Sequence, residues 1–592
     1  MTTKQLTALA LFIAVGTAQA GEKEELLKLR NTTANLINEL VKQGVLSEKV
    51  AQDMIKRAET DAETQVAEQA AKPESQKPEP GEVRVPYVPK FVKDEIRQQV
   101  RMELREEVVG DVMQKAKAEK WGTPDALPEW VNRIKISGDM RLRSQNDFMA
   151  NDNITRQDLI NNSTLYRNYQ AINNAGGFFQ TPFQNQFLNT DKDRQRFRER
   201  LRLAIDAKIT DSVKAGIRLA TGNFPDPVST NQSLGNNGAQ YQFNLDRAYL
   251  QYDAVDDEGF KWFTIAGGRI ANPWYVGGGE FSAGSEMVWD TDLSFEGFAA
   301  TTRKSLGSSS NQPNKHDKSR QVYATVGGFP LDETQLSAGA KWLVGGQVGL
   351  DWGFNNQDAL KVGVAYYDYL NIRARPNTGQ SFGNCFANTP ESNLSVPGFL
   401  QSGNSLTEIC NNNLLDKNGI PVTGSAHQPG LFGLASDFNI INANLSYDMA
   451  RFAPYHVIFG ADFAKNVGFD VKNLPVDNNY QTDLPSGQRP TKVRDETNAW
   501  QVRVDFGWPK VDNSGEWNVF TQYKYVERDA VLDGFTDSDF HLGGTNAKGW
   551  VIGTNYGLMK NVWFTGRWLS TDVITGPKFG IDTLQLDLNA KF

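Results

Sequence analysis

Hydrophobic and polar residues alternate one by one along much of this chain. Between Ile134 and Arg143, isoleucine, glycine, methionine and leucine occupy one set of alternate positions, and lysine, serine, aspartate and arginine occupy the other. Arg194–Lys208 repeats the pattern, with arginine at five successive alternate positions. Alternation with a period of two predicts β-strands that have one apolar and one polar face. Their length of about ten residues suits a strand that is tilted across a bilayer.

Segments of this kind recur from residue 131 to the end of the chain, and we count sixteen. An even number of strands is typical of single-chain outer-membrane barrels. The predicted fold is therefore an all-β transmembrane barrel of about 16 antiparallel strands at residues 131–592. The predicted strands are 134–144, 196–209, 212–222, 243–254, 260–270, 292–302, 320–329, 337–354, 359–369, 437–447, 455–465, 498–508, 517–527, 547–556, 562–572 and 582–592.

The lengths of the connections favour a barrel, because outer-membrane barrels alternate short periplasmic turns with long external loops. Short connections follow the second, fourth, eighth, tenth, twelfth and fourteenth predicted strands. Long ones follow the first, third, fifth, ninth, eleventh and thirteenth. The long polar stretch 303–319 breaks this order. Either a periplasmic excursion lies there, or the strand count is wrong locally.

The last predicted strand alternates leucine and alanine with polar residues and ends the chain on Phe592. A C-terminal amphipathic strand that closes on phenylalanine resembles the segment read by the outer-membrane barrel assembly machinery. We therefore predict that Phe592 is an assembly signal and that this machinery is a partner of the chain.

The first 20 residues indicate a signal peptide. Lys4 precedes an apolar stretch from Leu6 to Gly16, and Ala18–Ala20 has the small-x-small form that signal peptidase cleaves. The alternative is a buried N-terminal helix. Cleavage would place the mature protein outside the bacterial cytoplasm.

Residues 21–130 are predicted to form a mainly helical periplasmic extension. Leucines at heptad spacing between Leu26 and Leu40 predict a helical hairpin or a short coiled coil at 21–71. Five prolines indicate an extended linker at 72–89, and a helix and lead-in follow at 90–130.

Composition excludes several classes of protein. After residue 20 no apolar run is long enough for a membrane helix. Two cysteines and four scattered histidines in 592 residues argue against a metal site, and nothing indicates a cofactor. No phosphate-binding glycine loop or nucleophile triad is evident, so we expect no enzyme. A net charge of −8 also argues against nucleic-acid binding.

The region from Leu127 to the end resembles the putative porin family of Gram-negative outer membranes. The segments that carry the resemblance are 127–143, 218–232, 245–250, 266–270, 288–292 and 365–369. The resemblance implies a bacterial outer-membrane location and a water-filled channel for the passive diffusion of ions and small hydrophilic solutes. Trimers are common among porins of this size, so a homotrimer is a candidate assembly, although the sequence alone does not require one.

Arginines are concentrated on the polar faces of the first five predicted strands. An arginine at the lipid midplane costs about 2–4 kcal/mol, so these side chains should face the lumen or lie at its rim. They are Arg141, Arg143, Arg194, Arg196, Arg198, Arg200, Arg202, Arg218, Arg247 and Arg269. The hypothesis is a pore-lining basic wall, and the alternative is a solvated rim without a selective role.

The long connection at 271–291 is a candidate constriction loop. It contains three consecutive glycines and the carboxylates Glu280, Glu286 and Asp290. In general porins a loop at this position folds into the lumen. Carboxylates on the loop facing arginines on the wall would create a transverse field that sets ion preference.

Three further expectations concern the periphery of the barrel. Cys385 and Cys410 lie in one long connection and are predicted to form a disulfide, with two free thiols as the alternative. Tryptophans near strand ends are candidates for aromatic girdles in contact with outer-membrane lipid. They are Trp508, Trp517, Trp550, Trp563 and Trp568.

A second function fits the sequence. The barrel could be a scaffold that holds a periplasmic partner or the cell wall through residues 21–120. Deletion of 22–89 separates the two functions, because a passive pore should still conduct and a scaffold should lose its partner.

Overall fold

The computed structural model describes residues 133–161, 166–223, 226–274, 287–307, 320–333, 339–375, 394–411, 429–470 and 495–592. Contacts divide the chain into two compact units, Met1–Lys115 and Ala116–Phe592, and all described residues belong to the second. The predicted signal peptide, helices and linker of 1–130 lie outside the described residues, as do Glu280, Glu286 and Cys385.

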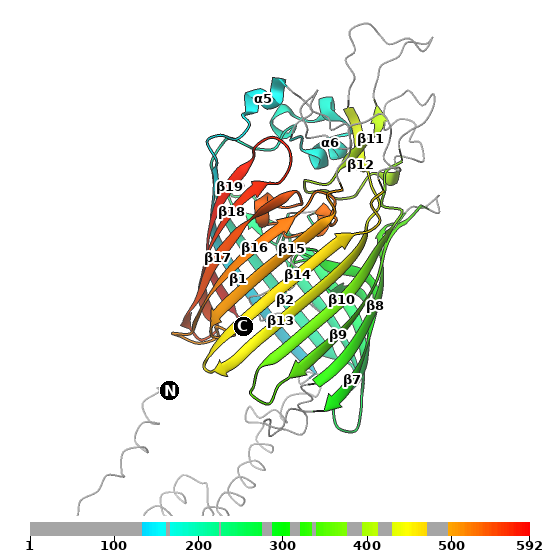
Figure 1. Cartoon of the computed structure of the whole chain (residues 1–592), viewed down its shortest axis with the longest axis vertical. Helices are drawn as coiled ribbons and strands as arrows, with labels where there is room; N and C mark the ends of the chain where they lie inside the picture. The colour runs from blue at the N-terminus through cyan, green and yellow to red at the C-terminus, as the bar shows by residue number, and fades with distance from the viewer. Residues whose placement is uncertain are drawn as a thin grey trace, which may run out of the picture. The chain divides into compact units, whose positions relative to one another are not determined.

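Sixteen antiparallel strands form a closed barrel, because β1 pairs with β2 on one side and with β19 on the other (Figure 1). The two-residue strand β4 (Gln232–Ser233) adds a short pairing to β2 beyond the end of β3. The barrel strands are β1 (Ile134–Met149), β2 (Arg194–Lys208), β3 (Val213–Ala220), β5 (Asn244–Val255), β6 (Lys261–Ala271), β7 (Ser294–Gly307), β8 (Arg320–Asp332), β9 (Lys341–Gly353), β10 (Ala359–Leu370), β13 (Asn439–Phe452), β14 (Tyr455–Asn466), β15 (Asn498–Gly507), β16 (Trp517–Val526), β17 (Ala547–Met559), β18 (Val562–Val573) and β19 (Gly580–Lys591).

The predicted barrel is confirmed, and each of the sixteen predicted segments overlaps one barrel strand. The irregular connection after the sixth strand does not reflect a miscount. Gly307 pairs with Arg320, so residues 308–319 connect β7 and β8 at the end of the barrel that carries the short turns. The strand count is therefore right in this region, and the alternative of a local miscount is wrong.

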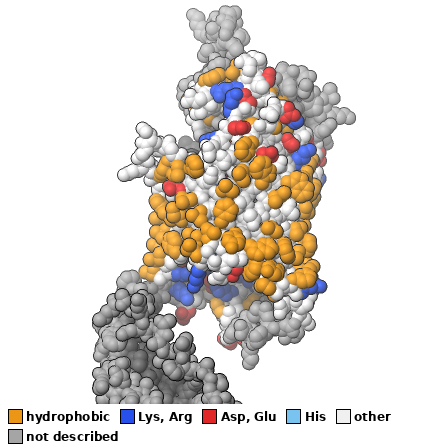
Figure 2. Space-filling view, turned by 90° about the vertical axis from the view of Figure 1, so that its left-hand side faces the viewer, with side chains coloured by type: hydrophobic (Ala, Val, Ile, Leu, Met, Phe, Trp, Pro, Cys, Tyr) orange, Lys and Arg blue, Asp and Glu red, His pale blue; other side chains and the backbone are white. Residues whose placement is uncertain are grey.

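The alternation along the strands separates an apolar outer surface from a polar interior. Phe298, Val326 and Val348 are more than half exposed on the outside. On the face drawn in Figure 2, apolar side chains form a broad belt over the barrel wall, and charged side chains gather toward its two ends. Exposed apolar side chains occur on the other strands as well. Among the described residues, no helix is both long and apolar enough to cross a membrane. The apolar belt is the surface that a bilayer would cover.

The long connections and their short helices gather at the upper end of the barrel in Figure 1, opposite the C-terminus. These minor elements are α5 (Arg156–Asn161), α6 (Tyr169–Ala175), η2 (Phe178–Gln180), η3 (Phe183–Asn185), β11 (Leu406–Asn411), β12 (Pro429–Leu434), η6 (Asp533–Phe535) and η7 (Phe540–Leu542). Cys410 lies in β11, but its side chain is outside the described part of the structure.

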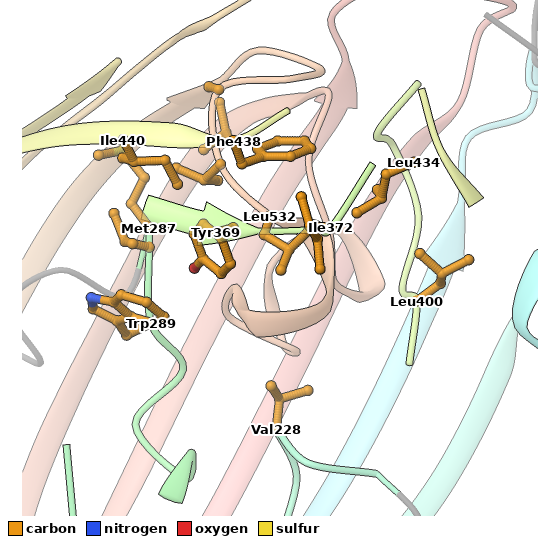
Figure 3. Close-up of a cluster of buried hydrophobic side chains, with 14 of the residues drawn as sticks. Val228, Met287, Trp289, Tyr369, Ile372, Leu400, Leu434, Phe438, Ile440 and Leu532 are labelled. Carbon is orange, nitrogen blue, oxygen red and sulfur yellow. The ribbon is translucent and has the colours of Figure 1, made fainter. Parts of the chain in front are cut away.

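An apolar cluster fills part of this upper end (Figure 3). Trp289 from the connection before β7 packs against Tyr367 of β10, with ring centroids 4.9 Å apart. Leu532, from the connection after β16, and Leu434 and Phe438, from the connection after β10, join the same cluster and are almost fully buried. Loops that cover a barrel mouth with a packed core leave only part of the lumen for solutes.

The tryptophans predicted as girdles separate into two groups. Trp508 packs edge-on against Tyr455 and Trp517 at the short-turn end, and Trp550 and Trp568 are exposed on the outer surface. Trp563 lies opposite the inward-facing Asn589 and therefore shares the inner face of the barrel. Both residues line an internal cavity. For Trp563 the girdle prediction is wrong.

Candidate functional site

The arginines of β1 and β2 form a ladder on the inner face of the barrel. Arg141 lies opposite Arg200 and Arg143 lies opposite Arg198 in the strand register. Residues opposite each other on antiparallel strands project from the same face. Met140 and Leu142, which alternate with these arginines along β1, are about two-fifths exposed on the outside. The arginines therefore point inward.

Two cavities lie along this ladder. The lower cavity, of about 790 Å³, is at the short-turn end and is lined by Arg141, Arg200 and Arg202 among others. The upper cavity, of about 460 Å³, is at the long-loop end and is lined by Arg194 and Arg198 among others. No described residue lines both cavities.

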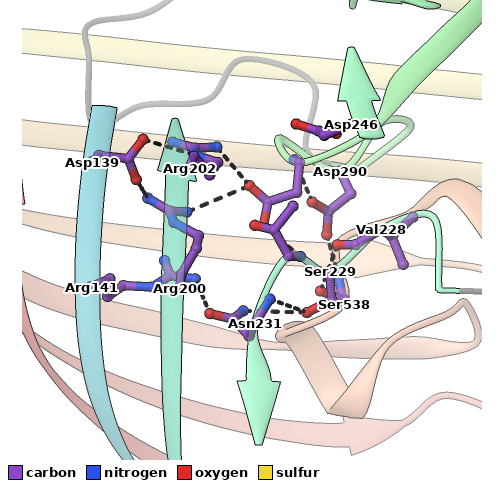
Figure 4. Close-up of polar contacts among 12 residues, drawn as sticks. Asp139, Arg141, Arg200, Arg202, Val228, Ser229, Asn231, Asp246, Asp290 and Ser538 are labelled. Carbon is purple, nitrogen blue, oxygen red and sulfur yellow. Dashed lines mark hydrogen bonds and ion pairs between the residues drawn. The ribbon is translucent and has the colours of Figure 1, made fainter. Parts of the chain in front are cut away.

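The two cavities are separated by a partition that we define as Ser229, Asn231 and Ser538 with the ladder side chains they contact. Arg141 donates to the Asn231 side chain (Figure 4). Arg198 Nη2 donates to Ser229 Oγ over 3.2 Å. Ser538 Oγ donates to the Val228 carbonyl over 3.2 Å. Two loops, 221–231 and 527–546, thus meet the arginine ladder at one level of the barrel.

Below the partition, two aspartates bind two arginines in a compact network (Figure 4). Arg200 Nη2 and Arg202 Nε each lie 2.8 Å from an oxygen of Asp139. Arg202 Nη1 also lies 3.1 Å from Asp292 Oδ1. Burial alone would raise the pKa of Asp292, but Arg200 and Arg202 hold it below its ordinary value. Asp292 is therefore ionised at neutral pH.

Arg143 is held at the level of the partition by two carboxylates. Its Nε lies 2.8 Å from Asp587 of β19, and its Nη1 lies 2.8 Å from Asp539 of the loop 527–546. The arginine side chain is 1% exposed. Burial would raise the pKa of Asp539, but Arg143 and Arg567 keep it well below its ordinary value. This triad fastens the loop to the barrel wall.

Arg141 and Arg198 of the ladder, and Arg247 of β5, have no carboxylate partner among the described residues. Arg198 contacts only the neutral groups of Gln145 and Ser229, and Arg141 contacts Asn231. Arg247 donates to Ser294 Oγ over 3.2 Å. A guanidinium is always charged, so each of these groups contributes a positive charge that no ion pair neutralises.

The lower cavity has a strong excess of positive charge. Nine basic side chains line it, against four aspartates and the terminal carboxylate of Phe592. The upper cavity is lined by three arginines and two aspartates. The path along the ladder is therefore basic, although the whole chain carries a net charge of −8.

Comparison with known proteins identifies the family. A family model described as a putative porin matches residues 30–592. The chain belongs to the putative porin family. A search of curated protein sequences found no match.

Solved structures that are similar to this porin over most of its length have low sequence identity to it. OprB of Pseudomonas putida at high pH is 11% identical, covers 80% of this chain and 97% of its own, and has a TM-score of 0.39. The outer-membrane channel DcaP of Acinetobacter baumannii is 10% identical, with 78% and 97% covered and a TM-score of 0.37. OmpF of Salmonella typhi in complex with daunomycin is 11% identical, with 78% and 97% covered and a TM-score of 0.33.

Nine of the ten predicted wall arginines lie in β1, β2, β3 and β5, and eight of these line one of the two cavities. Arg143 is the ninth and lies between the cavities. Arg269 of β6 lies elsewhere. It is opposite Ala248 and Glu296, and Ala248 is opposite Ile217, which is half exposed on the outer surface. Arg269 therefore shares the outer face of the porin and pairs there with Glu296.

The loop carboxylate Asp290 is inside the barrel mouth but does not face the ladder. Its two oxygens accept hydrogen bonds from the backbone nitrogens of Asp292 and Ser538, each at 2.8 Å. Burial raises the pKa of Asp290 well above its ordinary value, and the neighbouring Asp292 and Asp537 raise it further. Asp290 thus ties the connection before β7 to the loop 527–546.

Sequence reasoning missed the carboxylates that neutralise the ladder. Asp139, Asp292, Asp539 and Asp587 come from two strands and two connections, and Asn231 and Ser229 come from a third. Alternation along β1 and β19 places Asp139 and Asp587 on the inner face, so these two could have been found by aligning the strands. No cluster of residues suited to a metal ion occurs in the part of the porin that the structure describes.

Proposed function

We propose that this porin is a passive diffusion channel that prefers anions, and that its solutes move along the arginine ladder of β1 and β2. The observation that supports the proposal is the run of guanidinium groups from Arg194 in the upper cavity to Arg202 in the lower one. Rings or rows of basic side chains are a general means of anion selection in pores.

The apolar cluster fills one part of the barrel mouth, so solutes would pass on the side of the arginine ladder. The packed side chains around Trp289 and Phe438 occupy one part of the barrel mouth (Figure 3). The two cavities lie beside β1 and β2. Solutes that enter from the long-loop end would therefore meet Arg194 and Arg198 first. Low-dielectric walls around a charged cleft focus its field and raise the local concentration of the opposite ion.

The ladder contains two kinds of arginine: those that form ion pairs with aspartates and those that have no carboxylate partner among the described residues. Arg143, Arg200 and Arg202 are neutralised by aspartates and hold the loops in place. Arg141 lines the lower cavity and Arg198 lines the upper cavity, and neither has a carboxylate partner among the described residues. We assign anion selection to these two arginines. An anion that passes from the upper to the lower cavity would contact Arg198 first and Arg141 next.

Substitution of the two free arginines tests the proposal. In Arg141→Gln and Arg198→Gln, the ratio of chloride to potassium permeability should fall, because each change removes a positive charge from the partition. The matched control is Arg269→Gln, which removes an arginine from the outer face and should leave the ratio unchanged. The measurement is the reversal potential of single channels in a potassium chloride gradient. An unchanged ratio in both ladder variants would contradict the assignment.

A further inference from the structure

The upper cavity combines positive charge with an apolar lining. Arg194, Arg196 and Arg198 enter it from β2, and Asp147 neutralises Arg196 at 2.8 Å. Asp226 is the other carboxylate in the lining. The cavity also contains His541, but burial lowers the pKa of this histidine to about 4, so it is neutral at pH 7. One positive charge remains in excess.

The apolar part of the lining comes from three connections. Phe187 and Leu188 precede β2, Phe399 and Leu400 follow β10, and Phe579 precedes β19. Phe187, Leu400 and Phe579 are almost fully buried in the apolar cluster of the barrel mouth. Leu188 and Phe399 are only partly buried where they pack against that cluster, so these two present apolar surface to the cavity.

Arg198 is the group in this cavity best placed to bind an anion. It donates to Gln145 and Ser229, both neutral, and its buried Nε has no hydrogen-bond partner among the described atoms. A buried donor without a partner costs free energy that a bound oxyanion would recover. A cavity of about 460 Å³ is of the size that holds a small organic molecule.

We propose that the upper cavity is a binding site for small organic monoanions with an apolar body, such as aromatic carboxylates. The carboxylate would bind Arg198, and the apolar body would lie against Leu188 and Phe399. This inference rests on the proposed anion-preferring channel and adds the class of solute that the outer end selects. Inorganic anions would pass without using the apolar surface.

Block of the chloride current by benzoate and by acetate tests the inference on the intact porin in planar bilayers. Benzoate should halve the current at about a ten-fold lower concentration than acetate, because its ring buries apolar area that acetate lacks. Benzyl alcohol, which has the ring without the charge, should not block. Equal potency of benzoate and acetate, or block by benzyl alcohol, would overturn the inference.

Two variants and a control locate the site. Leu188→Asn and Phe399→Asn should raise the half-blocking concentration of benzoate toward that of acetate and leave acetate unchanged. Phe183→Asn is the control, because Phe183 is more than half exposed and lies outside the cavity lining. An equal effect of the control would overturn the site.

The reversal potential, measured first, keeps this test separate from that of the proposed function. A chloride-preferring channel without benzoate preference contradicts only the binding site. A channel without chloride preference contradicts the proposed function itself.

Discussion

At the scale of single residues, the arginines of the ladder differ in what would be left behind if each were removed. Arg143 is buried between Asp587 and Asp539, so its removal would leave two carboxylates without their partner. Arg198 contacts only neutral groups, so its removal leaves no buried carboxylate without an ion-pair partner. Removing one member of a buried ion pair is much more costly than removing a charge with neutral neighbours.

Arg143→Met should therefore destabilise the barrel by about 3–5 kcal/mol, the usual cost of breaking a buried ion pair. Arg198→Met is the matched control on the adjacent strand, and we expect a much smaller loss. The measurement is the free energy of unfolding of both variants in denaturant. Similar losses in the two variants would show that the carboxylates around Arg143 do not depend on it.

The inward direction of these arginines could be predicted from the sequence, and their ion pairs could not. Alternation within β2 is local and fixes which face each arginine occupies. The partners of Arg143 lie 444 and 396 residues away along the chain, and only the closure of β1 on β19 and the inward fold of a loop bring them together. The carboxylates of 271–291 were predicted to face the ladder, but Asp290 bonds backbone groups instead.

At the scale of elements, the loop 527–546 is the segment that ties the barrel mouth together. Asn404, from the connection after β10, donates to the carbonyls of Arg528 and Val531 and accepts from the backbone nitrogen of Asp533. The side chain of Asp529 accepts from Ser405 over 2.6 Å. Several buried polar groups of the loop are thus satisfied by the connection after β10.

Two buried carboxylates make the packing of this loop dependent on pH. Burial raises the pKa of Asp533 from 3.8 to about 7, with Asp529 as the neighbouring charge. Burial also raises the pKa of Asp529 to about 6, against the opposing effect of Arg528 and in the same direction as Glu496. A raised carboxyl pKa means that the packed loop binds a proton more tightly than the unpacked loop does.

The contribution of these two carboxyls to the stability of the packed loop should therefore be complete below about pH 4 and should be lost as the pH rises through about 7. For Asp533 the loss is at most about 4 kcal/mol, at 1.36 kcal/mol per pKa unit. Hydrogen exchange of the loop amides, corrected for the intrinsic pH dependence, measures this. Asp533→Asn keeps the shape and removes the charge, so its protection should vary less with pH. Protection in the wild type that rises with pH would contradict this account.

At the scale of the whole molecule, the charges of the porin are separated by place. The chain is acidic overall, yet the lining of the lower cavity is strongly basic. The outer wall of the barrel is apolar (Figure 2), and an arginine there would face lipid. In the lumen these arginines can stay hydrated or form ion pairs. Strand alternation and connection lengths predicted this barrel, because both patterns can be read from short stretches of the sequence. The loop cluster that fills part of the mouth was not predicted, because it joins connections that are distant in sequence.

The reversal potential of single wild-type channels in a potassium chloride gradient tests the central claim most directly. We expect stable open steps and a reversal potential displaced toward the equilibrium potential of chloride, because Arg141 and Arg198 leave the path basic. A displacement toward the equilibrium potential of potassium, or an inserted barrel that carries no current, would contradict it.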